Sequence, residues 1–200
     1  MAIREAEVTI KGTSPLLQNN PQTVNQFNPF TKAKKAITAK RTAKTDDDLL
    51  ELADLEVESK LYFDDKIGVY VPARWLTEAV ITSAYAVAKI GRGKMRGGIF
   101  PTAEKIPLVY RGQNKVRSVV DLVKNQEFRH FMILPQGQVR VAKYAPIFHD
   151  WSFSTLIEFD DSVIDFGTLK RVAEHTAKYV GFGDFRPTFG RAIAEVKNVC

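Results

Sequence analysis

Apolar and polar residues alternate with a period of two in several short stretches, which predicts half-buried β-strands. The first stretch is 6–11, in which Ala6, Val8 and Ile10 are the apolar members. The same alternation, or a short apolar run, predicts further strands at 61–63, 69–71, 106–110, 128–134, 139–142, 151–159 and 192–199. Turn residues between neighbouring strands indicate two hairpins, one at 61–71 and one at 128–142.

Two longer stretches have the period of an amphipathic helix. One begins after Pro72 and ends before Gly91, and it is apolar on more than one side. The other begins at Asp165, a residue suited to cap a helix, and ends at Gly181. A shorter acidic helix is expected near 46–58.

The order of these elements, with insertions set aside, is strand, helix, strand, strand, helix, strand. This order is typical of a ferredoxin-like (RRM-like) α+β domain, an antiparallel sheet with two helices packed on one face. We expect one domain over 1–200, with extra hairpins and a long insertion at 18–60 after the first strand. The second face of the sheet then needs a cover, such as the hairpins, another subunit or nucleic acid.

The first part of the insertion is polar and basic. Between 18 and 45 the apolar periodicity is lost, and the run from Lys32 to Lys44 contains no acidic residue. This composition predicts a mobile arm that orders on binding an anionic partner, and the alternative is a solvated disordered segment. The candidate binding residues of the arm are Lys34, Lys35, Lys40 and Arg41.

Composition narrows the classes of function. The formal charge of +6 and the pI near 9.4 favour a polyanionic partner. Cys200 is the single cysteine, so no internal disulfide and no cysteine metal site is expected. No apolar run approaches the roughly 20 residues of a membrane span, and 1–5 lacks the apolar part of a signal peptide. We therefore expect a cytoplasmic protein without a membrane partner.

The segment 181–191 has the most distinctive composition, with three glycines, three phenylalanines and two arginines in eleven residues. Glycine lets a backbone approach a ligand closely, arginine forms bidentate contacts with phosphate, and phenylalanine can stack on a base. The candidate nucleic-acid-binding residues are Gly181, Gly183, Phe185, Arg186, Gly190 and Arg191. The alternative is a helix end followed by a tight turn whose phenylalanines fill the core.

A second segment at 91–98 also combines glycines with basic residues. It predicts a flexible loop that contacts the same strand through Arg92, Lys94 and Arg96. The alternative for each of these side chains is a solvated surface position.

The chain resembles the RAMP superfamily, the repeat-associated RNA-binding proteins that include backbone subunits of CRISPR surveillance complexes. The resemblance rests on the order of elements and on the glycine-rich segment before the last strand, and it covers 5–11 and the chain from 61 onward. Uncharacterised bacteriophage proteins have a run similar to 181–191. Membership implies binding of single-stranded RNA or DNA, often by repeated subunits along the strand. Unlike CRISPR backbone subunits, this chain is short and has no second ferredoxin-like half, which favours the phage-type assignment.

The chemistry of the sequence favours a binding protein over an enzyme. No phosphate-binding loop of the Gly-x-x-x-x-Gly-Lys-Ser/Thr type and no nucleophile motif occurs, and no cofactor or metal is expected. Some RAMP proteins are metal-independent ribonucleases that use histidine, so His130, His149 and His175 keep that alternative open. A further alternative is a structural or inhibitory phage protein that binds a host protein.

Overall fold

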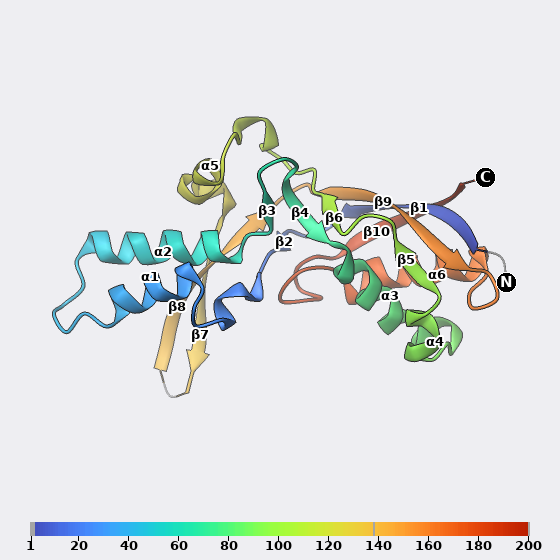
Figure 1. Cartoon of the computed structure of the whole chain (residues 1–200), viewed down its shortest axis with the longest axis horizontal. Coiled ribbons are helices and arrows are strands. Elements are labelled where there is room, and N and C mark those ends of the chain that lie inside the picture. Colours follow the sequence, from blue (N-terminus) through green and yellow to red (C-terminus); the bar gives the residue numbers. More distant parts are fainter. Residues whose placement is uncertain (1–2, 138, 200) are drawn as a thin grey trace. The chain divides into compact units, whose positions relative to one another are not determined.

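The computed structural model describes residues 3–137 and 139–199. These residues form a mixed α+β protein with antiparallel sheets, and they divide into two compact units. We call them the sheet unit, the described residues of 1–17, 64–113 and 148–200, and the hairpin unit, those of 18–63 and 114–147. Figure 1 shows the elements of both units along the chain.

The sheet unit is built on a four-stranded sheet with the strand order β10-β1-β9-β5. Its elements are β1 (Ile3–Gly12), β2 (Leu16–Leu17), β4 (Gly68–Pro72), α3 (Ala73–Ala88), α4 (Arg92–Arg96), β5 (Ile99–Pro101), β6 (Lys105–Pro107), β9 (Ser152–Asp160), α6 (Phe166–His175), the π-helical turn η4 (Thr176–Val180) and β10 (Ala192–Val199). Outside the main sheet, β4 pairs antiparallel with β6.

The pairing of β1 explains the direction of the other strands. β1 runs antiparallel to both β10 and β9, and β9 runs antiparallel to β5. Consequently β1 is parallel to β5 with β9 between them, and β9 is parallel to β10 with β1 between them. The chain passes from β1 to β5 through α3, and from β9 to β10 through α6.

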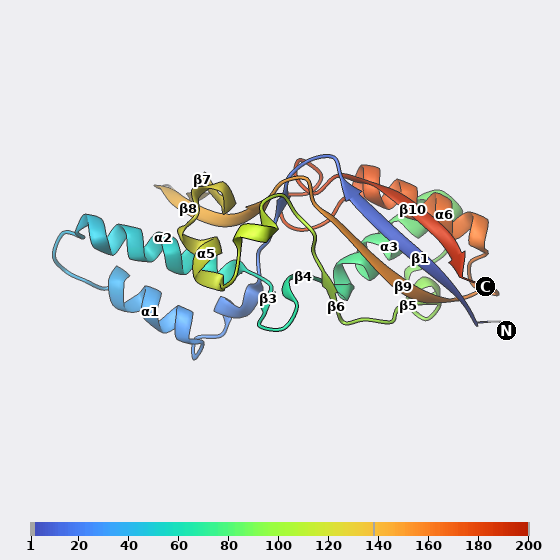
Figure 2. The same ribbon diagram turned by 90° about the horizontal axis from the view of Figure 1, so that it is seen from above.

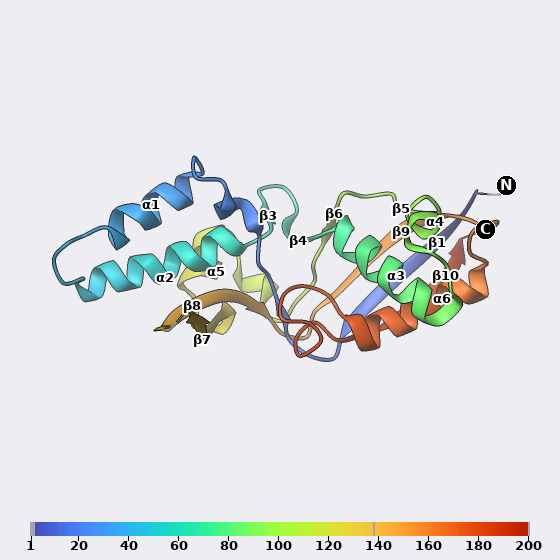
Figure 3. The same ribbon diagram turned by 90° about the horizontal axis from the view of Figure 1, so that it is seen from below.

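The two helices cover one face of this sheet, as Figure 3 shows. The alternating apolar residues of β1 are buried there, as the sequence predicts for Ala6, Val8 and Ile10. Leu76 of α3 and Leu169 of α6 are buried as well. Each large side chain removed from water in this way contributes about 2 kcal/mol to stability. The burial of apolar side chains is therefore the main reason that the two helices pack on this face of the sheet.

One strand of the sheet was not predicted. The sequence predicted a strand at 106–110 after the first helix, but the strand at the edge of the main sheet is β5, which pairs with β9 through Ile99 and Phe159. The nearby β6 pairs with β4 instead. Three residues with a proline at the end are too short for a recognisable alternation, and pairing with β9 determines their conformation.

The hairpin unit contains helices packed with a β-hairpin. Its elements are η1 (Pro21–Val24), α1 (Pro29–Thr38), α2 (Asp46–Lys60), α5 (Val119–Lys124), η3 (Gln126–Phe128), β7 (Arg129–Gln136) and most of β8 (Val139–Phe148); β3 (Phe63–Asp64) and η2 (Gln113–Lys115) lie at its boundaries. β7 and β8 pair antiparallel, with Phe131 opposite Tyr144. Figure 2 shows α1 beside α2 within this unit.

The insertion is more ordered than the loss of periodicity indicated. Helix α1 lies within the segment that we predicted as a mobile arm. Asn28 caps this helix by accepting from the Phe30 amide, and Pro29 occupies its first turn. Thr45 caps the acidic helix α2 and forms a reciprocal capping box with Asp48. The unit also includes 114–147, which the sequence did not connect with the insertion.

Candidate nucleic-acid interface

The segment 181–191 is a loop between η4 and β10, and we call it the glycine-arginine loop. Gly181 ends the helical stretch: its amide donates to the carbonyl oxygen of Thr176 at 2.8 Å, and its φ is 70°. A residue with positive φ is the usual end of a helix, so the sequence correctly places the helix end here.

Three glycines of the loop occupy positions that leave no space for a side chain. A Cβ at Gly181 would lie 2.9 Å from the carbonyl oxygen of Gly190, and a Cβ at Gly183 would lie 2.4 Å from that of Leu17. At Gly190 the corresponding distance to the carbonyl oxygen of Phe182 is 1.7 Å. All three also have positive φ. Their role in the structure is therefore to let backbone pass close to backbone.

Several backbone amides of the loop donate within the protein. Phe182 donates to the carbonyl oxygen of Gly190 at 2.9 Å, Asp184 to that of Leu17 at 3.0 Å, and Gly190 to that of Pro15 at 2.8 Å. The last two bonds hold the loop against residues 15–17. These amides are therefore occupied within the protein, and the side chains of the loop are the better candidates for contact with a ligand.

The phenylalanines of the loop have different environments. Phe182 is fully buried, and its ring lies edge-on to Phe153 at 5.4 Å and to Trp151 at 6.2 Å. Phe185 is 43% exposed and has a φ of 52°, unusual for a residue with a side chain. Phe182 therefore fits the alternative of core packing, whereas the ring of Phe185 is accessible to a ligand.

The two arginines are exposed and have no acidic partner among residues 3–137 and 139–199. The guanidinium of Arg186 donates through Nη1 to the carbonyl oxygen of Gly181 at 3.4 Å, a long contact with a neutral group. Arg191 is bound to the protein through its backbone, which contacts Thr13 and Ser14. The positive charge of both side chains is therefore presented to solvent.

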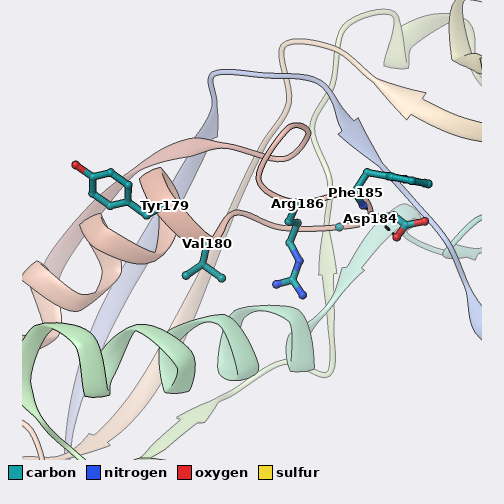
Figure 4. Close-up of a pocket in the computed structure, with 6 residues that line it drawn as sticks. Tyr179, Val180, Asp184, Phe185 and Arg186 are labelled. Atoms are coloured by element: carbon teal, nitrogen blue, oxygen red, sulfur yellow. Dashed lines mark hydrogen bonds between the residues drawn. The ribbon is translucent and has the colours of Figure 1, made fainter.

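An open hollow of about 530 Å³ lies beside Arg186. It is lined by Tyr179, Val180, Gly183, Asp184, Phe185 and Arg186. Figure 4 shows that the side chains of Val180 and Arg186 extend to the same side of the loop. The residues that line the hollow thus include one arginine and two exposed aromatic residues, since Tyr179 is 60% exposed. One carboxylate, Asp184, also lines it and accepts from the Phe185 amide at 3.1 Å.

Tyr179 was not among the residues selected from the sequence. It lies in η4, at the end of the last helical stretch, where a single exposed aromatic residue does not by itself indicate a binding site. Its neighbour Lys178 has its Nζ 5.3 Å from the centre of the Tyr179 ring. An exposed aromatic residue two positions before the helix-ending glycine was the signal that could have identified it.

The second basic segment is a short helix and not the flexible loop predicted from its glycines. Residues 92–96 form α4, and both of its arginines contact Glu78 of α3. The Nη2 atoms of Arg92 and Arg96 lie 3.6 Å and 2.9 Å from the carboxylate oxygens of Glu78. Lys94 is exposed and forms no ion pair within the part of the chain that the structure describes. Pairing with one glutamate leaves the segment with a net charge of +2.

The predicted basic residues of the insertion belong to the hairpin unit, on or just after α1. Lys34 is half-buried and donates to Ser59 at 2.7 Å, whereas Lys35 is exposed. Lys40 pairs with Asp48, and its hydrogen bond is the largest cause of the lowered pKa of that carboxyl. Arg41 is exposed. Of these four side chains, Lys35 and Arg41 have no bonded partner among the described residues.

The uncovered face of the main sheet is acidic. Opposite the helices, β1, β9 and β10 present four glutamates and two lysines: Glu5, Glu7, Glu158, Glu195, Lys11 and Lys197. Glu5 lies directly opposite Glu158 across the β1–β9 pair, an arrangement of like charges that disfavours the isolated sheet. Such a face repels a phosphate backbone, which leaves the loops as the better candidate surface.

The three histidines lie in separate settings. Nδ1 of His175 lies 3.2 Å from the hydroxyl of Ser83, and its ring lies 4.9 Å from that of Tyr179. His149 lines a small hollow of about 100 Å³ together with Asp150 and residues 12–15. His130 lies in β7, within the hairpin unit.

The described residues contain neither a cluster of metal ligands nor a helix suited to span a membrane. Within 3–137 and 139–199, no three side chains of histidine, cysteine, aspartate or glutamate gather in a way that could hold a metal ion. None of the helices found in these residues combines the length and apolar character of a membrane span.

Comparison with known proteins finds similarity among solved structures. No family model and no curated protein matches the chain. The chain is similar to a chain in the cryo-EM structure of the type III-B Cmr-beta bound to cognate target RNA, with 14% sequence identity and a TM-score of 0.47. The match covers 98% of this protein and 61% of that chain, so this protein spans about three fifths of its length.

Proposed function

We propose that this protein binds single-stranded nucleic acid through the glycine-arginine loop and does not act as an enzyme. The observation that carries the proposal is the pair Arg186 and Arg191, two exposed guanidinium groups of one loop without a carboxylate partner among the described residues. A sugar-phosphate backbone supplies the repeated negative charge that such groups bind in a planar, bidentate geometry.

The hollow beside Arg186 favours a single strand over a duplex. The exposed rings of Phe185 and Tyr179 offer faces on which a base can stack. Only an unpaired base presents its face in this way, because bases in a duplex are stacked on one another. Stacking is worth about 1–3 kcal/mol per base and depends little on sequence. We therefore expect binding without strong sequence preference, to RNA or to DNA.

The ferredoxin-like, RAMP-like assignment of the sheet unit is part of this proposal. The order β10-β1-β9-β5 supports it, because each helix connects two parallel strands that have one strand between them. This is the split β-α-β connection expected from the sequence. The assembly of repeated subunits along the strand, as a homo-oligomer or within a larger complex, and an origin in a phage or mobile element rest on the sequence resemblance alone.

The absence of catalysis is proposed from the positions of the histidines. His130 lies in the hairpin unit, whereas His149 and His175 lie in the sheet unit, and His175 contacts a serine and a tyrosine instead of a second acid or base. A ribonuclease needs two such groups on opposite sides of a phosphate. Incubating the protein with RNA in the absence of metal tests this part, and the proposal requires that the RNA stays intact.

Fluorescence anisotropy with labelled single-stranded RNA and DNA tests binding. Titrations at several salt concentrations should show affinity that falls linearly on a double logarithmic plot, because binding releases counterions. A duplex of the same sequence serves as the control and should bind more weakly. Failure of both single strands to bind at low salt would refute the proposed function.

The acidic face of the sheet favours a second candidate function, binding of a protein partner. Exposed apolar residues lie among its glutamates, including Phe100, Leu156 and Ile193. A partner with basic and apolar side chains would complement this face. Light scattering tests the first function against the second: particles that grow with oligonucleotide length indicate coating of a strand, and an unchanged particle size argues against it.

A further inference from the structure

Three lysines of the hairpin unit gather around one carboxylate. Glu56 of α2 is 8% exposed, and its Oε1 accepts a hydrogen bond from Nζ of Lys143 at 2.9 Å. Its Oε2 accepts from the backbone amide of Tyr144 at 2.8 Å and lies 3.9 Å from Nζ of Lys60. The Lys60 ammonium itself donates to the carbonyl oxygen of Tyr144. One buried negative charge thus lies beside a lysine of β8 and a lysine of its own helix.

Lys34 reaches this cluster from α1. Its Nζ donates to the hydroxyl oxygen of Ser59 at 2.7 Å, and Ser59 lies one turn after Glu56 on α2. Within the described part of the chain, no carboxylate forms an ion pair with Lys34. Counted over these contacts, the cluster contains three ammonium groups and one carboxylate, an excess of two positive charges.

The electrostatics of Lys34 reflect this excess. The pKa of Lys34 is lowered to about 8, chiefly by burial; Lys60 and Lys143 contribute to the lowering, and Glu56 acts in the opposite direction. A single carboxylate does not compensate for the burial and for two neighbouring cations. An additional anion beside the three ammonium groups would supply the missing charge.

We infer that Lys34, Lys60 and Lys143 form a binding site for a phosphate group. Each ammonium offers several donors, and a phosphate group has enough acceptor oxygens to receive one from each of three directions. The side chains of Lys60 and Lys143 are 18% and 36% exposed, so the cluster is partly desolvated yet reachable from solvent. Partial desolvation strengthens the attraction between the lysines and the anion.

Two sources of the phosphate group are compatible with this chemistry. One is a free phosphate, such as inorganic phosphate, and the other is a phosphodiester of a nucleic-acid strand. The second source rests on the proposed function, whereas the first does not. The experiment therefore tests both ligands separately.

Nuclear magnetic resonance of the full chain labelled with ¹³C at the lysine Cε atoms tests the site. Inorganic phosphate, and in a second sample an unstructured single-stranded oligonucleotide, is added at low ionic strength, and the titration of the Lys34 signal is followed with pH. We expect the pKa of Lys34 to rise by about one unit or more when the site is filled. A response to phosphate assigns a free source, and a response to the oligonucleotide assigns a strand.

Two variants of α1 provide the matched comparison. Lys34→Met removes one cation of the cluster, and Lys35→Met removes the exposed cation next to it. Calorimetry should show phosphate binding that weakens about tenfold or more in the first variant, the value of one charge-assisted hydrogen bond, and stays unchanged in the second. Circular dichroism checks that both variants fold. If Lys34→Met does not fold, Lys34→Gln takes its place.

The inference is overturned if neither ligand moves the Lys34 signal, or if sodium chloride at the same ionic strength moves it as far. It is also overturned if Lys34→Met and Lys35→Met bind phosphate equally. Intact strand binding with an unresponsive Lys34 would refute this site alone. A phosphate response without any strand binding would refute only the proposed function.

Discussion

Phe182 and Gly190 close the glycine-arginine loop by a contact that leaves no space for a side chain. The amide of Phe182 donates to the carbonyl oxygen of Gly190 at 2.9 Å, while a Cβ on Gly190 would lie 1.7 Å from the carbonyl oxygen of Phe182. This pair connects the buried ring of the loop to the residue that precedes Arg191. The presentation of the arginines therefore depends on it.

Replacing Gly190 with alanine should destabilise the sheet unit by more than about 2 kcal/mol, because the new Cβ adds a backbone collision to an unfavourable φ. Gly68→Ala is the matched control, since Gly68 also has positive φ but nothing lies within 4 Å of its Cβ position. It should cost about 1 kcal/mol. Urea unfolding followed by circular dichroism measures both, and equal losses would contradict the role of the close contact.

Arg186→Gln should weaken binding to all single-stranded sequences alike, because the guanidinium contacts phosphate and not bases. One lost phosphate contact should reduce the slope of log affinity against log salt by about 0.7. The control is Arg4→Gln, which makes the same change of charge in β1 at an arginine paired with Asp161. Anisotropy titrations at several salt concentrations give both slopes, and a drop in slope for Arg4→Gln as large as for Arg186→Gln would contradict the assignment.

Glu78→Gln should strengthen binding of nucleic acid about two- to fivefold, if the basic segment 92–96 contributes to the interface. The substitution removes the carboxylate that contacts Arg92 and Arg96, and exposed ion pairs are worth about 0.5–1 kcal/mol at most. Glu195→Gln breaks a similar exposed pair with Lys197 on the opposite face of the sheet. The affinity of Glu195→Gln for nucleic acid should stay close to that of the unchanged protein. An unchanged affinity of Glu78→Gln would place α4 outside the interface.

The lowered pKa of Lys34 predicts how stability changes with pH. The group binds a proton more weakly in the folded state, with a pKa of about 8, than in the unfolded chain, where the ordinary value is 10.5. Below pH 8 the charged form of Lys34 therefore lowers the free energy of unfolding by its full amount. This destabilisation decreases as the pH rises towards 10.5. Lys34→Met should be more stable than the unchanged protein at pH 7, with a difference that shrinks between pH 8 and 10.

Lys35→Met is the control for this prediction. Lys35 is exposed on the same helix, so its loss should leave the dependence of stability on pH unchanged. Urea unfolding at a series of pH values measures all three proteins. A difference between Lys34→Met and the unchanged protein that stays constant from pH 7 to 10 would contradict the cause assigned to the pKa.

The glycine-arginine loop shows which part of the candidate site was readable in the sequence. The helix end at Gly181 and the final strand at 192–199 follow from local rules, since a glycine at a helix end and an alternating run depend only on neighbours in the chain. The exposure of Phe185 and the burial of Phe182 do not follow from such rules. The burial of Phe182 depends on Trp151 and Phe153, which lie just before β9 and within it.

The basic segments show the same limit. The composition of 91–98 and 32–44 correctly located positive charge, but it also predicted a loop and a mobile arm where α4 and α1 lie. Short helices of this kind depend on caps and on packing against neighbours more than on periodicity. The partners of the lysines and arginines were also hidden, because Glu78, Asp48 and Ser59 are distant in the chain or on another helix.

The amino-acid sequence by itself determined the mixed α+β class, the apolar face of the first strand, the two main helices and the location of the positive charge. These are properties of local pattern and composition. Only the tertiary structure decided that β5 completes the main sheet, that 114–147 joins the insertion, and that Arg186 and Arg191 point to solvent while Lys34 lies in a cluster. The physical reason is that burial and charge pairing depend on residues brought together across long separations in the chain, and no local pattern records which residues those are.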